Sequence, residues 1–334
     1  MNPHPDRLVD SFGRVHDNLR ISVTDRCNIR CVYCMPESVR FLPRADLLSF
    51  EEIERFTRVA ASLGVAKIRL TGGEPLVRRD LPRLVERLAA IPGIVDVGLT
   101  TNGILLGPLA RPLRDAGLRR INISLDTLDP GRFRELTRRD GLDRVIEGVF
   151  AAKAAGFDPV KLNGLAIKGM TDDDVVPLGR FAREHGLQLR FIEYMPLDAG
   201  NLWERDKVLL ADEILDRLAA GIGPLTPAPG QDPRAPALDY DYDDGGGRVG
   251  LIASVSRPFC ASCNRIRITA DGKLRNCLFA LDETDLRPLL RNEPNDDASL
   301  AQALRSSIAA KWEGHEINTA RFIKPGRLMH SIGG

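Results

Sequence analysis

Long hydrophobic runs are missing from this chain of 334 residues. No stretch approaches the roughly 18 consecutive apolar residues that a membrane-spanning helix needs. The first twenty residues contain no apolar run of signal-peptide length. We therefore expect a cytoplasmic protein that does not associate with a membrane.

An excess of charge of one sign is also missing, since 47 Lys and Arg face 46 Asp and Glu and the formal net charge is +1. Proteins that bind nucleic acids usually carry a basic excess, so we expect no nucleic-acid partner and only local anion sites. The phosphate-binding motif G-x4-G-K-[ST] is absent as well, which excludes an ordinary P-loop nucleotide site.

Cysteine is scarce but clustered. Six cysteines are too few for a disulfide scaffold, and in the cytosol they should be reduced. They divide into two triplets with none left over: Cys27, Cys31 and Cys34 with spacing C-x3-C-x2-C, and Cys260, Cys263 and Cys277 with spacing C-x2-C-x13-C. Reduced cysteines grouped in this way point to metal binding or catalysis.

The number of cysteines in each triplet distinguishes between the candidate metal sites. A structural zinc ion takes four ligands, and pairing Cys31 and Cys34 with Cys260 and Cys263 would leave Cys27 and Cys277 unexplained. A [4Fe–4S] cluster held by three thiolates keeps one iron without a protein ligand. By analogy with open catalytic metal sites, substrate or cofactor would bind at that position.

Strand-like and helix-like segments alternate through the first two thirds of the chain. Six β-then-α units in series imply parallel strands joined by right-handed crossovers. An open doubly wound sheet and a curled, partly closed barrel both fit this pattern. Marked residues follow five of the six strands, which favours an incomplete (β/α)6 TIM-like barrel: Cys27–Cys34, Gly72–Pro75, Thr100–Gly103, Ser124–Asp126 and Met195–Pro196.

The composition changes near residue 222. A Pro- and Gly-rich stretch reads as a linker, and two β-hairpins follow, the second turning at Asp271-Gly272. We predict a partial barrel over residues 1–222 and a C-terminal extension over residues 223–334 that carries the hairpins, the second cysteine triplet and a terminal Gly pair.

The first triplet carries a family resemblance. C-x3-C-x2-C with an aromatic residue before the last Cys, here Tyr33, resembles the signature of the radical S-adenosylmethionine (SAM) enzymes. "TGGEP" at Thr71–Pro75 resembles the motif that receives the SAM amino group in that family. The resemblance implies that SAM chelates the open iron, and that one electron cleaves SAM to methionine and a 5′-deoxyadenosyl radical.

The second triplet narrows the resemblance to the GTP 3′,8-cyclase family of molybdenum cofactor biosynthesis. The similar segments cover nearly the whole chain: "RISVTDRCNIRCVYCMP", "IRLTGGEPLVRRDL", "LTTNG", "RINISLDTLD", "FIEYMPL", "DGGGRVGLI", "SVSRPFCASCNRIRIT" and the final Gly-Gly. The implied reaction abstracts hydrogen from C3′ of GTP, closes a ring onto C8 of guanine and yields 3′,8-cyclo-7,8-dihydro-GTP. Implied partners are a low-potential electron donor and cyclic pyranopterin monophosphate synthase, which takes the product; we expect a monomer or homodimer.

The resemblance also assigns residues. It implies two [4Fe–4S] clusters, one on each triplet, with the guanine bound at the open iron of the second. The remaining roles are SAM contacts at Tyr33, Gly73, Ser124 and Met195, GTP contacts at Arg20, Arg69, Thr100, Lys161, Arg265, Ile266 and Arg267, and a catalytic tail at Gly333 and Gly334. A cation within a parallel strand is unusual, because such strands are commonly buried on both faces; the interior of a barrel would supply the anion partner that it needs.

Two other functions remain possible from the sequence. One is a radical SAM enzyme that modifies peptides, which would be expected to show more C-terminal cysteines and no cationic triphosphate pocket. The other is a zinc-dependent nucleic-acid-binding module, against which the net charge of +1 argues.

Overall fold

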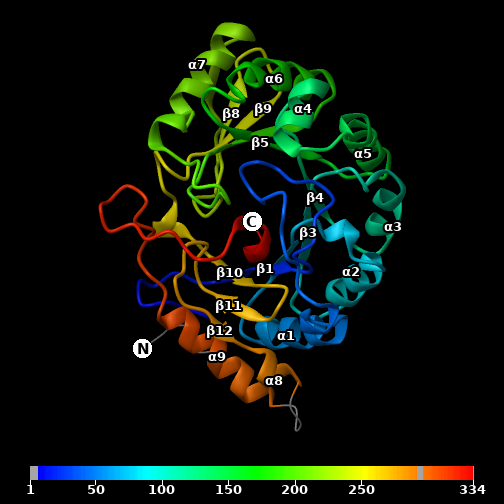
Figure 1. Ribbon diagram of the computed structural model, residues 1–334, viewed down its shortest axis with the longest axis vertical. Helices are drawn as coiled ribbons and strands as arrows, with labels where there is room; N and C mark the ends of the chain where they lie inside the picture. The colour runs from blue at the N-terminus through cyan, green and yellow to red at the C-terminus, as the bar shows by residue number, and fades with distance from the viewer. Residues whose placement is uncertain (1–6, 292–295, 334) are drawn as a thin grey trace.

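The computed structural model describes residues 7–291 and 296–333. Within these residues one sheet of twelve strands runs in the order β12-β11-β10-β1-β2-β3-β4-β5-β6-β9-β8-β7. The sheet curls into a ring, and α10 (Met329–Ile332), near the end of the described residues, lies inside it (Figure 1). No helix in these two segments is long and apolar enough to cross a membrane.

Six parallel strands form the middle of the sheet, as the alternating pattern predicted. They are β1 (Asn18–Ser22), β2 (Lys67–Thr71), β3 (Asp96–Thr101), β4 (Arg120–Ser124), β5 (Lys161–Ala166) and β6 (Gln188–Glu193). The helices that follow them lie on the outside of the ring (Figure 1): α1 (Phe50–Ser62), α2 (Leu81–Ala89), α3 (Ala110–Asp115), α4 (Pro130–Thr137), α5 (Leu142–Ala154), α6 (Val175–Glu184) and α7 (Ala211–Gly221). The predicted partial barrel is confirmed.

Local sequence explains where the first helix begins and ends. The Glu52 N–H donates to the Ser49 hydroxyl at 3.1 Å, and the Ser49 N–H donates to the Glu52 carboxylate at 2.6 Å, so these two residues form a capping box. Gly64 follows the helix with φ of 91°, a conformation that glycine adopts without a Cβ clash. Ile53 and Phe56 lie on the buried face against the sheet.

The barrel strands alternate between an apolar outer face and a polar inner face. Leu19 and Ile21 are fully buried in the core, while Arg20 between them faces the other way. On β2, Arg69 lies between the equally buried Ile68 and Leu70. The apolar core therefore lies between sheet and helices, and the space inside the ring, which we call the lumen, is polar.

The C-terminal strands extend the same sheet at both ends. β9 (Arg248–Ile252) pairs in parallel with β6, and β10 (Arg265–Ile268) pairs in parallel with β1. Both predicted hairpins are present, because β8 (Leu238–Tyr242) pairs antiparallel with β9, and β11 (Lys273–Arg275) pairs antiparallel with β10. The division at residue 222 stays a prediction, and strands from both sides of it share one sheet.

The stretch predicted as a linker contains a short edge strand. β7 (Leu225–Pro227) pairs with β8, and the edge position tolerates a proline because its outer side needs no N–H donor. At the opposite edge lies β12 (Thr284–Asp285), followed by α8 (Arg287–Arg291) and α9 (Asp297–Ala309). Arg55 of α1 donates to Asp297 at 2.8 Å and so ties α9 to the barrel. The last helix is α10 (Met329–Ile332).

Candidate active site

The first cysteine triplet lies in the loop that leaves the C-terminal end of β1. The Cys34 N–H donates to the Cys31 carbonyl at 2.9 Å and the Met35 N–H donates to the same oxygen at 3.0 Å, which winds the loop into a turn. Burial raises the pKa of Cys27 to about 11 and that of Cys34 to about 12. Such thiols ionise when a metal supplies positive charge, so the donor set fits an iron–sulfur cluster.

The glycines of the TGGEP segment are required by the cysteine loop itself. A Cβ on Gly73 would lie 2.4 Å from the carbonyl oxygen of Arg26, and one on Gly72 would lie 2.6 Å from that of Thr24. The Gly73 N–H donates to the Thr24 carbonyl at 2.8 Å. The two loops are thus in direct contact, which places Gly73 beside the cysteine loop.

Glu74 connects this contact to the next strand. Its carboxylate accepts from the Thr101 hydroxyl at 2.7 Å and from the Asn102 N–H at 2.7 Å, and burial raises the pKa of Glu74 to about 7. The Asn102 side-chain amide in turn lies 3.7 Å from the Cys27 sulfur. Neither Glu74 nor Asn102 was assigned a role from the sequence, although both stand in segments quoted for the resemblance.

Tyr33 and Ser124 line one small cavity beside Cys31. The Tyr33 hydroxyl donates to the carboxylate of Asp126, which also accepts from the Leu165 N–H at 2.8 Å. Asp126 thus fixes the aromatic residue of the cysteine motif, and this role was missed. Met195 follows β6 and packs, with Tyr33, against a second apolar cluster. The other cavity-lining residues include Ile29, Asn102, Leu125, Thr127 and Phe133.

The lumen is lined with cations at one level of the sheet. In the strand register Arg20 stands opposite Arg69 on one side and opposite Arg267 on the other. Burial, followed by repulsion from neighbouring cations, lowers the pKa of Arg69 to about 9 and that of Lys161 to about 8. The Arg69 guanidinium donates to the Thr100 hydroxyl at 3.3 Å. Crowded, desolvated cations of this kind need a polyanion for full neutralisation.

Unpaired nitrogens mark the same place. The Arg20 Nε and the Arg265 Nη2 are buried and have no hydrogen-bond partner. Two further cations repel Lys161: Arg190 on β6, and Arg120 on β4, which also pairs with Asp96 at 2.5 Å. The alternation in "RINIS" and "QLRFIE" signalled both, but neither was assigned. Ile266 points the opposite way from Arg265 and Arg267, into the apolar core, so only its main chain is placed to meet a ligand.

The second triplet gathers at one end of the β10–β11 hairpin. Cys263 precedes β10, Cys277 follows β11, and Cys260 begins a short 3-10 helix (Cys260–Ser262). Burial alone would raise the pKa of Cys263, but Arg265 and Lys311 outweigh it and lower the value to about 7. The Lys311 Nζ lies 3.7 Å from the Cys263 sulfur and donates to the Arg265 carbonyl at 2.9 Å. A thiolate is favoured here, which also fits a cluster.

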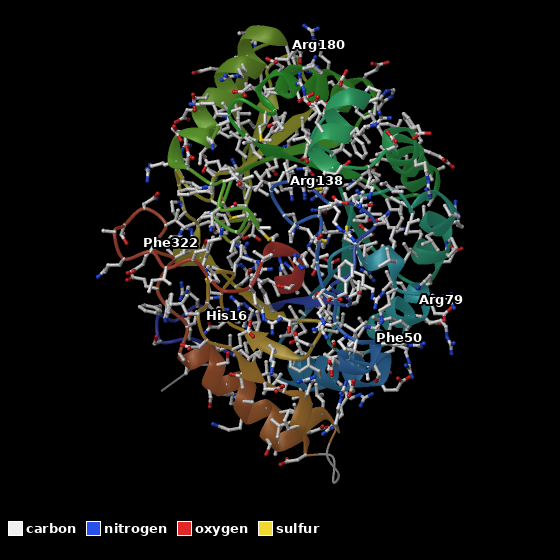
Figure 2. The ribbon with its side chains drawn as sticks, viewed as in Figure 1. His16, Phe50, Arg79, Arg138, Arg180 and Phe322 are labelled. Carbon is white, nitrogen blue, oxygen red and sulfur yellow. The ribbon has the colours of Figure 1, made fainter. Side chains whose placement is uncertain are left out.

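A buried ionic group supports this second triplet from behind. Arg14 donates to the carbonyl oxygens of Cys260 at 2.7 Å, Trp312 at 2.6 Å and Glu313 at 2.6 Å. Its guanidinium also pairs with Asp10 at 2.6 Å, and His16, labelled in Figure 2, lies 3.0 Å from the same carboxylate. The segment before β1 therefore contacts both the turn at Cys260 and the distant stretch at Trp312 and Glu313.

The zinc alternative finds no support in this arrangement. Among residues 7–291 and 296–333, no group of three or more His, Cys, Asp and Glu side chains is placed to hold a metal ion. Cys31 and Cys34 with Cys260 and Cys263 therefore do not form the four-thiol site that we considered.

The two triplets lie at opposite ends of the lumen. Asn18, the first residue of β1, stands opposite Arg265, the first residue of β10, and the two strands run in parallel. Cys263 comes just before this level, whereas Cys27 comes after β1 has ended. Arg20 and Arg267 therefore lie between the two cysteine sites.

The C-terminal tail enters the same space. The Arg267 guanidinium donates to the Gly333 carbonyl at 2.8 Å. Gly333 has φ of 79°, and a Cβ there would lie 2.6 Å from the Thr71 hydroxyl oxygen. Only glycine fits that position without strain. Gly334, assigned with it from the sequence, lies outside the described residues.

Comparison with known proteins agrees with this geometry. Residues 21–182 match a family described as "Radical SAM superfamily", and residues 187–317 match "Molybdenum Cofactor Synthesis C". A protein of Rhodopirellula baltica named GTP 3′,8-cyclase is 51% identical, covering 99% of this chain and 93% of that protein. One of Streptomyces coelicolor with the same name is 47% identical, covering 98% and 96%. This chain belongs to the GTP 3′,8-cyclase family.

Solved structures support the fold of this GTP 3′,8-cyclase family member. Streptococcus suis SuiB bound to S-adenosylmethionine superposes with a TM-score of 0.60 at 19% identity, covering 88% of this chain and 69% of that one. The protein anSMEcpe with bound AdoMet gives a TM-score of 0.57 at 16% identity, covering 83% and 81%. This chain therefore shares its fold with both of these proteins.

Proposed function

We propose that this chain converts GTP to 3′,8-cyclo-7,8-dihydro-GTP, the first step of molybdenum cofactor biosynthesis. One observation carries the proposal: a lumen lined by buried cations has a cysteine triplet at each end. Sequence identity of 51% to a relative named GTP 3′,8-cyclase supports it. The rival, a peptide-modifying radical SAM enzyme, would share the barrel but has no use for several desolvated cations in its centre.

Cys27, Cys31 and Cys34 would hold a [4Fe–4S] cluster, with Tyr33, Gly73, Ser124 and Met195 around SAM. Bound there, cluster and SAM supply one-electron chemistry that ends in a hydrogen-abstracting radical. The chain's own part is to fix the geometry of this end of the lumen. The contact of Gly73 with the cysteine loop and the Tyr33–Asp126 hydrogen bond do so.

Cys260, Cys263 and Cys277 would hold a second [4Fe–4S] cluster, near which the guanine would lie. The triphosphate would be held by Arg20, Arg69, Thr100, Lys161, Arg265 and Arg267, because charge-assisted hydrogen bonds to phosphate are strong and Arg offers two parallel donors. The main chain at Ile266 completes this set. The same cations orient the ribose toward the first triplet, which is how positioning contributes to rate.

Gly333 and Gly334 would complete the wall of the lumen and support catalysis from the tail. A slim chain end that enters the lumen excludes water from a reactive site without blocking it. We further propose a cytoplasmic enzyme that receives electrons from a low-potential donor and passes its product to cyclic pyranopterin monophosphate synthase.

The test is anaerobic incubation of the reconstituted enzyme with SAM, a reductant and GTP, followed by product analysis. We expect 5′-deoxyadenosine, methionine and 3′,8-cyclo-7,8-dihydro-GTP in matched amounts, with the hydrogen of C3′ recovered in 5′-deoxyadenosine when deuterated GTP is used. SAM cleavage without any GTP-derived product would refute the proposal.

A further inference from the structure

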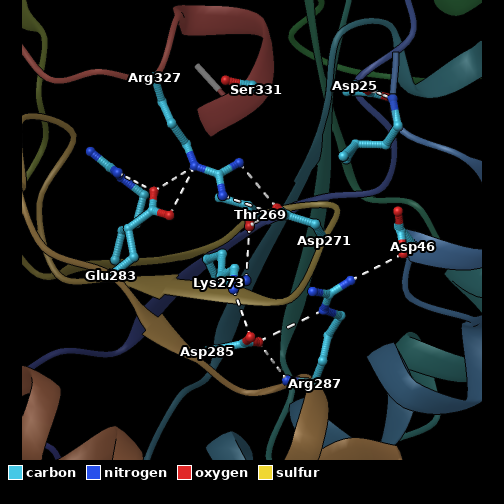
Figure 3. A network of polar contacts seen from close by, with 12 residues as sticks. Asp25, Asp46, Thr269, Asp271, Lys273, Glu283, Asp285, Arg287, Arg327 and Ser331 are labelled. Atoms are coloured by element: carbon cyan, nitrogen blue, oxygen red, sulfur yellow. Dashed lines mark hydrogen bonds and ion pairs between the residues drawn. The ribbon is translucent and has the colours of Figure 1, made fainter. Parts of the chain in front are cut away.

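The tail that carries Gly333 is fastened to the barrel by an arginine. Arg327, just before α10, donates from Nη1 and Nη2 to the two carboxylate oxygens of Asp271 at 3.1 and 2.8 Å. Its Nε donates to Glu283 at 2.9 Å. Figure 3 shows the guanidinium lying between the two carboxylates, below α10. All three nitrogen atoms of the guanidinium therefore donate to a carboxylate.

Both carboxylates belong to the segment that carries the second cysteine triplet. Asp271 lies in the turn between β10 and β11, and Glu283 comes just before β12. Cys277 stands midway between them in the chain. Arg327 therefore fastens the tail to the hairpin whose β10 strand presents Arg267, which contacts Gly333.

Contacts other than those with Arg327 also hold the two carboxylates in place. The Thr269 hydroxyl donates to Asp271 at 2.6 Å, and Glu283 pairs with the buried Arg275, whose guanidinium also donates to the Ala280 carbonyl at 2.5 Å. The pKa of Asp271 is raised by burial and lowered by Arg327 and Thr269, with a net lowering, so the carboxylate stays charged near neutrality. The hairpin thus offers a preformed receptor for one guanidinium, and it keeps its own contacts when that group is removed.

We propose that Arg327 is the positioning residue that holds the C-terminal tail in the lumen by bridging Asp271 and Glu283. Residues that enter a lumen lose conformational entropy, so this segment needs an anchor close to it. Arg327 is separated from Gly333 only by Leu328 and the four residues of α10. Loss of the bridge frees the tail and its contact between His330 and Cys34. The cysteine loop keeps the backbone hydrogen bonds that Arg30 and Val32 donate to the end of α4, each at 2.9 Å. The anchoring is independent of the reaction, and only its effect on product formation depends on the proposed function.

The experiment compares full-length, anaerobically reconstituted Arg327→Ala and Arg327→Lys with Arg321→Ala. Arg321 is the matched control because it is exposed and pairs at 2.8 Å with Glu316, away from the tail's carboxylates. Amide hydrogen exchange of residues 328–333 reports tail docking without any turnover. We expect at least tenfold faster exchange in Arg327→Ala, an intermediate value in Arg327→Lys, and the unchanged rate in Arg321→Ala.

Kinetics separate positioning from binding. Arg327→Ala should lower kcat at least tenfold, while the iron content and the GTP dissociation constant stay within threefold of the unmodified enzyme. A double variant with Asp271→Asn should be no worse than Arg327→Ala alone, because both changes break one interaction. Unchanged exchange in the tail of Arg327→Ala would overturn the proposal, and so would a loss of iron that parallels the loss of tail protection. A protected tail in an enzyme that makes no product from GTP would refute the proposed function and leave the anchor standing.

Discussion

The guanidinium of Arg267 donates a hydrogen bond to the carbonyl oxygen of Gly333 at 2.8 Å. The same arginine stands in register with Arg20 in the row of lumen cations. One side chain therefore lies at both the proposed triphosphate site and the C-terminal tail, whereas the Arg265 guanidinium, two residues earlier, lies over the Phe259 ring, 4.4 Å from its centroid. Substituting these two arginines should separate the two roles.

Arg265→Ala should weaken GTP binding by about 1.5–3 kcal/mol, the range for hydrogen bonds to charged groups. Guanosine, which has no phosphates, should bind nearly as before. Arg267→Ala should show a similar loss for GTP and, in addition, slower product formation at saturating GTP, because the tail loses a contact. Calorimetry with GTP and guanosine measures the first effect and kcat the second. Equal losses for GTP and guanosine would place these residues at the base or the sugar.

The cysteine triplets should be separable by mutation. The reconstituted enzyme should hold about eight irons, the sum of two four-iron clusters. Replacing Cys27, Cys31 and Cys34 with Ala should leave about four irons and abolish SAM cleavage. Replacing Cys260, Cys263 and Cys277 should also leave about four but retain some SAM cleavage while GTP cyclisation is lost. Iron analysis and 5′-deoxyadenosine assays measure both, and cyclisation by the second triple variant would reduce that cluster to a structural role.

Gly73→Ala should damage the SAM site specifically. The new Cβ would lie 2.4 Å from the Arg26 carbonyl oxygen, so the cysteine loop must move away from β2. We expect at least a tenfold loss of SAM cleavage and reduced iron at the first triplet. Gly223→Ala is the control, because a Cβ there meets no atom within 4 Å. Normal SAM cleavage by Gly73→Ala would show that the two loops need not touch.

His16 should make the fold sensitive to mild acid. Burial, with repulsion from Lys311, lowers the pKa of His16 from its ordinary 6.5 to about 4. Between pH 6.5 and about pH 4, His16 is protonated in the unfolded chain but neutral in the folded protein. The free energy of unfolding therefore falls by up to about 1.4 kcal/mol per pH unit across this range. The melting temperature should therefore drop more between pH 7.5 and 5.5 in the unmodified protein than in His16→Gln. Equal drops would mean that His16 is protonated in the folded state.

Short-range patterns predicted much of this molecule. The alternation of strand-like and helix-like segments predicted the partial barrel, and cysteine spacing identified both triplets. The contacts that fix the site are non-local and leave no such trace. The hydrogen bond from the Asn102 N–H to Glu74 and the one from the Tyr33 hydroxyl to Asp126 each join residues that are far apart in the sequence.

One omission was avoidable. Arg120 and Arg190 alternate with apolar neighbours as Arg20 and Arg69 do, and the reasoning that placed the latter in a barrel interior applies to them too. Ile266 shows the opposite limit. It was assigned together with its two neighbours, yet the pleat of the strand turns its side chain into the core.

β10 pairs in parallel with β1, and β9 pairs in parallel with β6. These pairings determine which fragments of the protein can be expressed separately. The matched families meet between residues 182 and 187, just before β6, which invites expression of the first part alone. Such a fragment would expose the unpaired backbone of β1, an edge that the intact protein covers with another strand. An unpaired strand edge can form hydrogen bonds with strands of other chains, so the truncated fragment should aggregate. Coexpressed with the remaining segment, it should instead be recovered as a noncovalent complex.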